Sequence, residues 1–153
     1  MTCLTHVGQV FFWLKRRALS ETGIIIEIWQ SFRRTPLWVQ IWVALILVPV
    51  NLLPLAFWGE PYAVWITIFS IGGMLPNLVI MMVGRGLSKC MALPHLLIWT
   101  PLVVMLGMLL QSDLGVSDGF RTVLTVILLV DLLSLVFDYI DGWKWWRGDR
   151  AIA

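Results

Sequence analysis

Four apolar stretches, each long enough to cross a bilayer as a helix, constrain this chain more than any other feature. They cover residues 37–58, 62–83, 92–110 and 120–140. A transmembrane helix needs about 20 apolar residues, so four of them take up more than half of a chain of 153 residues. The pattern predicts an all-α integral membrane protein. We expect a four-transmembrane-helix bundle over 37–142, ending at Gly142 as a helix stop, without a second folded domain.

The Lys and Arg residues are distributed unevenly around these stretches. All but Arg121 lie before the first stretch, between the second and third, or after the fourth: Lys15, Arg16, Arg17, Arg33, Arg34, Arg85, Lys89, Lys144, Arg147 and Arg150. Because loops on the cytoplasmic side carry the excess of Lys and Arg, the pattern predicts that both termini are cytoplasmic. The short loops suggest the inner membrane of a bacterium.

Residues 1–36 are too short and too polar to span, yet they are amphipathic. Apolar residues recur at helical spacing over 4–18, and a second apolar face contains Ile25, Ile28, Trp29 and Phe32. We expect one or two amphipathic helices in the cytoplasmic interface. A helix that binds a partner protein would show the same pattern, so this alternative stays open.

Tryptophans mark the ends of the predicted spans and the basic tail, residues 143–153. Trp and Tyr concentrate at the headgroup level, and cations attract anionic lipid. The sequence therefore predicts lipid-interface anchoring by Trp38, Trp42, Trp58, Trp143, Trp145, Trp146, Lys144 and Arg147. The alternative for the tail is a docking epitope for another protein, since Trp and Arg are frequent at binding hot spots.

The last apolar stretch carries polar residues at membrane depth. Asp131, Ser134 and Asp138 are spaced by three and four residues, which places them on one helical face. At 1.5 Å per residue, Asp131 lies about 15 Å inside the cytoplasmic edge. A charge at that depth costs about 2.5–3.5 kcal/mol on insertion scales, so we expect this face to point into the bundle.

Counting residues inward predicts partners for these groups. Thr100 at about 12 Å and Asn77 at about 10 Å are the candidate donors to Asp131. His95 and Asp138 share a shallower level, and Arg85 and Lys89 are expected near Asp141. Two interpretations follow. The polar face is either a proton or ion relay, or a structural device that fixes helix packing. The structural interpretation is favoured because the outer half offers no matching acid, only the polar side chains of Asn51, Ser70 and Thr125.

One short segment resembles a known family. Asp138-Tyr-Ile-Asp141-Gly142, followed by Arg147-Gly148-Asp149, is similar to the opening of the CDP-alcohol phosphatidyltransferase motif. The resemblance implies paired aspartates that hold a divalent metal against a pyrophosphate. Two tryptophans precede Arg147 where the motif has one small residue, and Asp149 has no second acidic pair after it. We therefore do not expect this enzyme.

Other signals for chemistry are sparse. Cys3 and Cys90 fall on the predicted cytoplasmic side and should be reduced. We expect no metal, no cofactor and, with a formal charge of +2, no nucleic acid. The predicted function is a non-enzymatic accessory or assembly subunit of a larger membrane complex, in contact with the lipid bilayer. The alternative is a small transporter or proton-coupled carrier that self-associates and uses Asp131.

Overall fold

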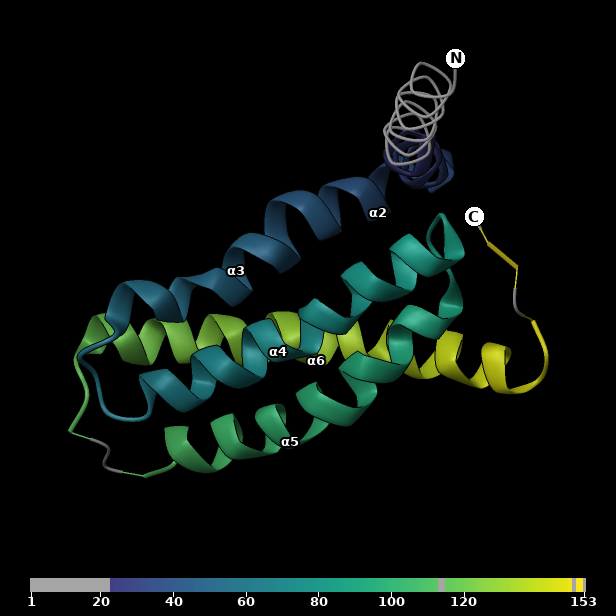
Figure 1. Ribbon diagram of the computed structural model, residues 1–153. Coiled ribbons are helices and arrows are strands. Elements are labelled where there is room, and N and C mark those ends of the chain that lie inside the picture. Colours follow the sequence, from purple (N-terminus) through teal and green to yellow (C-terminus); the bar gives the residue numbers. More distant parts are fainter. Residues whose placement is uncertain (1–22, 113–114, 150, 153) are drawn as a thin grey trace, which may run out of the picture.

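The computed structural model describes residues 23–112, 115–149 and 151–152, and these are almost entirely helical. A helical arm over 23–34 precedes the elements labelled in Figure 1. In chain order these are α2 Leu37–Ile41, the π-helical turn η1 Trp42–Leu47, α3 Val48–Leu52, the 3-10 turn η2 Leu53–Phe57, α4 Ala63–Gly84, the 3-10 turn η3 Lys89–Met91, α5 Ala92–Leu110 and α6 Asp118–Trp146. The first amphipathic face predicted over 4–18 lies outside the described residues.

Four helical segments are long and apolar enough to cross a membrane: Leu37–Phe57, Ala63–Gly84, Lys89–Leu110 and Asp118–Trp146. The four predicted stretches are thereby confirmed as helices of spanning length. The predicted helix stop at Gly142 is wrong, because α6 continues to Trp146. Gly142 is buried against α5, and a β-carbon at this position would lie 2.9 Å from Leu96 Cδ1. The glycine therefore permits close helix contact instead of ending the helix.

The first span is irregular, as its two prolines predict. A proline removes a backbone donor and clashes with the preceding turn. Pro49 is the second residue of α3, which follows directly on the π-helical turn, and Pro54 is the second residue of the 3-10 turn η2. These changes of helix type bend the span (Figure 1). They also leave Asn51 on the buried side of α3, which matters for the site below.

The core lies where α5 packs against both α4 and α6, and the first span also packs against α4 and α6 (Figure 1). Its largest fully buried apolar side chains are Trp99, Phe120, Ile66, Leu102, Leu106, Leu124 and Ile127. The α6 helix begins with Ser117 as N-cap, whose Oγ accepts from Phe120 N over 3.3 Å. Apolar side chains also cover the outside, with Val83 82% and Leu97 77% exposed. An apolar outer surface suits a bundle surrounded by lipid.

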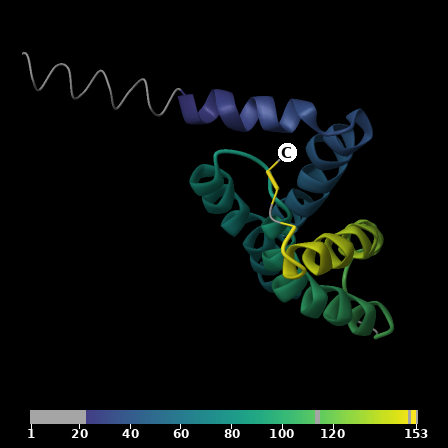
Figure 2. The same ribbon diagram turned by 90° about the vertical axis from the view of Figure 1, so that its right-hand side faces the viewer.

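The arm projects from one end of the bundle. Figure 1 shows it nearly end-on and Figure 2 lengthwise, so it runs roughly across the four spans. It is held at the loop after α4, where Ser31 Oγ accepts from Leu87 N over 2.8 Å. The chain end reaches the same loop through an isolated antiparallel bridge between Ser88 and Ile152. We call this end, which carries Arg33, Arg34, Arg85, Lys89, Lys144 and Arg147, the basic end.

Candidate polar site inside the bundle

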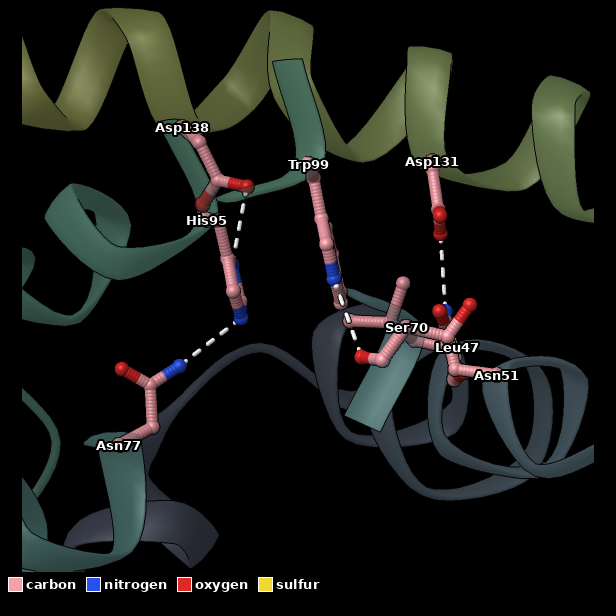
Figure 3. Close-up of polar contacts among 8 residues, drawn as sticks. All are labelled: Leu47, Asn51, Ser70, Asn77, His95, Trp99, Asp131 and Asp138. Atoms are coloured by element: carbon pink, nitrogen blue, oxygen red, sulfur yellow. Dashed lines mark hydrogen bonds and ion pairs between the residues drawn. The ribbon is translucent and has the colours of Figure 1, made fainter. Parts of the chain in front are cut away.

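The carboxyl group of Asp131 meets the side chain of Asn51 inside the bundle. Asn51 Nδ2 donates to Asp131 Oδ1 over 2.8 Å, and also to the carbonyl of Leu47 over 3.2 Å. Both residues are 0% exposed. Figure 3 shows their side chains reaching toward each other from α6 and α3. The pair ties the first span to the last, across 80 residues of sequence.

A second polar cluster lies on the same face of α6, two turns toward the basic end. His95 Nδ1 donates to Asp138 Oδ2 over 3.0 Å, and Asn77 Nδ2 donates to His95 Nε2 over 2.8 Å. This hydrogen-bond pattern assigns the imidazole proton to Nδ1. The cluster joins α4, α5 and α6 (Figure 3), and the predicted shared level of His95 and Asp138 is confirmed. Ser134 is buried between Asp131 and Asp138.

Trp99 separates the two clusters. Its ring stacks on the ring of His95, with 3.9 Å between centroids and 3° between planes, and its Nε1 donates to the carbonyl of Ser70 over 3.1 Å. Figure 3 shows the indole between the His95 cluster and the pair of Asn51 and Asp131. The ring lies where α4 has no side chain, since a β-carbon on Gly73 would come within 2.2 Å of Trp99 Nε1. The ring of Trp99 therefore lies between the two groups of polar side chains inside the bundle.

Neither of the partners predicted for Asp131 donates to it. Asn77 bonds His95 instead, and Thr100 shares a hydrogen bond of 3.3 Å with the Tyr139 hydroxyl at the exposed surface. Counting residues gives the depth of a side chain along a straight helix but not the direction in which it points. Asn51, which does bond Asp131, had been placed in the outer half on the same count.

Several buried polar atoms in the described residues have no hydrogen-bond partner. They are Asn51 Oδ1, Asp131 Oδ2, Asn77 Oδ1, Thr67 Oγ1, Ser70 Oγ and Trp42 Nε1. Two of these atoms belong to the pair of Asn51 and Asp131. A buried polar atom without a hydrogen bond destabilises the folded state. The two oxygens of this pair are both acceptors, and one hydrogen between them would satisfy both.

The charged residues at the basic end pair with the arm, with the chain end and within α6. Arg85 contacts Glu27 of the arm over 3.5 Å, and Asp141 lies 3.8 Å from Lys144 on its own helix. Lys89 donates to Asp149, and this hydrogen bond lowers the pKa of the Asp149 carboxyl below its ordinary value. Arg85 and Lys89 were expected near Asp141, and their ion-pair partners are Glu27 and Asp149, because the arm and the chain end fold back onto the loop.

The residues predicted to anchor the protein in the lipid interface lie mostly at the surface. Trp38 and Trp58 are exposed near the two ends of the first span, and Trp143 and Trp146 are exposed on the last turns of α6. The Arg147 guanidinium lies 4.9 Å from the ring centroid of Trp143, a cation–π arrangement. Trp42 and Trp145 are half-buried and Lys144 is exposed. Anchoring in lipid stays a prediction.

The segment that resembles the phosphatidyltransferase motif presents its acids separately. Asp138 points inward to His95, Asp141 is about half exposed, and Asp149 pairs with Lys89. Among the described residues, no group of three His, Cys, Asp or Glu side chains is placed to hold a metal ion together.

Two features of this site were missed from the sequence. Asn51 carried a signal, since it is a polar side chain between two prolines in a span. Trp99 and Gly73 carried none, because a Trp and a Gly in apolar helices are ordinary. No protein-family model, no curated protein and no solved structure matches this chain. The fold and the site define a helical bundle suited to a membrane, with two polar clusters in its interior.

Proposed function

We propose that this protein is a non-enzymatic accessory or assembly subunit of a larger membrane complex. The observation that carries the proposal is the position of Trp99, which fills the interior between the two polar clusters and rests on Gly73. A single chain with that ring in its centre offers no continuous polar path. Its buried polar groups instead bond one another across helices, which is how such groups commonly hold membrane helices together.

The surface at the basic end supports the same proposal. The arm extends across the bundle axis (Figure 2), and its Ile25 and Trp29 are 68% and 59% exposed. Glu27 and Ser31, on another side of the arm, hold it to the loop after α4. A fixed helix that displays aromatic and apolar side chains suits both the headgroup region and a partner subunit. We place this end in the cytoplasm from its excess of Lys and Arg, and the protein in a bacterial inner membrane from its short loops.

Purification from the native host in mild detergent tests the proposal. We expect a larger membrane protein to co-purify in stoichiometric amount and to be identified by mass spectrometry. The double variant Ile25→Ala, Trp29→Ala should lose that partner. The double variant Val83→Ala, Leu97→Ala removes apolar surface elsewhere and should keep it. Recovery of the wild-type chain alone, or only with itself, would contradict the proposal.

A second candidate is a proton-coupled carrier that acts as an oligomer and uses Asp131. The observation in its favour is the unpaired Asp131 Oδ2 in a fully buried position, with His95 and Asp138 between it and the basic end. A proton-flux assay in liposomes tests it. Flux that is lost in Asp131→Asn and kept in Asp141→Asn would favour the carrier, and absence of flux in the wild type would reject it.

A further inference from the structure

The pair of Asn51 and Asp131 has one satisfied hydrogen bond and two unsatisfied oxygens. Asn51 Nδ2 uses its two hydrogens on Leu47 O and Asp131 Oδ1, so it has none left to donate. The atoms that remain, Asn51 Oδ1 and Asp131 Oδ2, are both acceptors, and both are sealed from solvent without a partner. A carboxylic acid and a primary amide can join through two hydrogen bonds, and these two oxygens are the ones that the second bond would connect.

Among the described residues, two titratable groups act on Asp131, and neither is a free cation. The titratable groups that act on it are His95 from α5 and Asp138 from its own helix, and these two are bonded to each other. The buried polar side chains of α3 and α4, namely Asn51, Thr67, Ser70 and Asn77, carry no charge. In the described part of the chain, Arg85 and Lys89 are paired with Glu27 and Asp149. Desolvation would strongly disfavour a lone carboxylate in this interior.

We propose that the pair of Asn51 and Asp131 is a proton-binding site, in which Asp131 Oδ2 carries a proton and donates it to Asn51 Oδ1. The two side chains then form a neutral, doubly hydrogen-bonded link between the first and last spans. The proton satisfies both orphan oxygens at once. Trp99 separates this proton from the His95 cluster (Figure 3), so the site holds its proton instead of passing it on. This inference does not depend on the accessory function, which concerns the outer surface.

Infrared spectroscopy of the full chain in liposomes at pH 7 tests the proton directly. We expect the carbonyl band of a protonated carboxylic acid, which shifts on isotope labelling of aspartate. The band should vanish in Asp131→Asn and persist in Asp138→Asn. Absence of the band from the wild type, or its persistence in Asp131→Asn, would overturn the proposal without bearing on partner binding.

Thermal unfolding provides a second test with a matched pair of variants. The amide in Asp131→Asn supplies a permanent donor to Asn51 Oδ1, so we expect unfolding within about 2 °C of the wild type at pH 7. Asp131→Leu keeps the branched shape but replaces both oxygens with methyl groups, which leaves Asn51 without this partner, and it should unfold roughly 5 °C lower. If the site instead holds a carboxylate with a bound sodium ion, sodium chloride should stabilise the wild type more than choline chloride does, and Asp131→Asn should lose that difference. That result would overturn the proposal.

Discussion

The ring of His95 lies flat against the ring of Trp99, one helical turn away on α5, with 3° between their planes. Both residues are also bound to α4, His95 through Asn77 and Trp99 through the carbonyl of Ser70. The α4 helix can approach this closely because Gly73 has no side chain to meet the indole. The stack therefore couples the packing of α4 on α5 to the geometry of the polar cluster.

Replacement of Gly73 by Ala should destabilise the bundle. The new β-carbon would lie 2.2–2.9 Å from three atoms of the Trp99 ring, and overpacking of this kind costs about 1–3 kcal/mol. Gly72→Ala is the matched control, since nothing lies within 4 Å of its β-carbon position. Alanine should leave the control unchanged or more stable by up to about 1 kcal/mol. Thermal unfolding in detergent measures both, and equal melting temperatures for the two variants would contradict the role of Gly73.

His95 and Asp138 should be energetically coupled. His95→Phe keeps a ring against Trp99 but removes both nitrogens, and Asp138→Asn removes the acceptor charge. Residues in one hydrogen-bond network show coupling of about 0.5–3 kcal/mol in double-mutant cycles. Because His95→Phe removes the 3.0 Å contact and Asp138→Asn weakens it by removing the charge of its acceptor, the double variant should be less destabilised than the sum. Additive effects in reversible unfolding would show that the contact contributes nothing.

Loss of the Ser31 hydroxyl should loosen the arm. Ser31 is 3% exposed, and its Oγ accepts from Leu87 N. Ser31→Ala leaves that amide without a partner, at a cost of about 1–3 kcal/mol. We expect faster proteolysis within 23–34. Ser112→Ala is the control, since this exposed hydroxyl bonds only within its own turn. Unchanged arm cleavage in Ser31→Ala would contradict the docking of the arm on this loop.

The contact between Lys89 and Asp149 should depend on pH. Lys89 depresses the pKa of Asp149 in the folded protein, so the contact is present at neutral pH and is lost as pH falls through that depressed value, below about 3.9. The contact can be followed by the distance between two spin labels, one on Cys90 and one on a cysteine introduced in Ala151→Cys. Cys3→Ser removes the other cysteine. The distance distribution should be narrow at pH 7 and broad in strong acid. Asp149→Asn should be broad at both pH values, whereas Asp141→Asn should behave as the wild type.

The inward face of α6 was predictable because helical spacing needs only one helix. Asp131 and Ser134 are buried and Asp138 is nearly so, as their separation of three and four residues requires. Asp141, one turn further along α6, is about half exposed. Within one helix, period and depth can be read from residue numbers alone.

The sequence by itself determined four helices long and apolar enough to span a membrane, and the buried face of the last one. Lipid offers no hydrogen bonds, so a spanning segment must be about 20 apolar residues in a self-satisfied helix. Only the tertiary structure decided that Asn51 bonds Asp131, that Trp99 divides the interior, and that Gly142 lies inside a helix. These depend on which faces of different helices meet. The π-helical and 3-10 turns of the first span rotate its side chains in a way that residue counting from a regular helix cannot give.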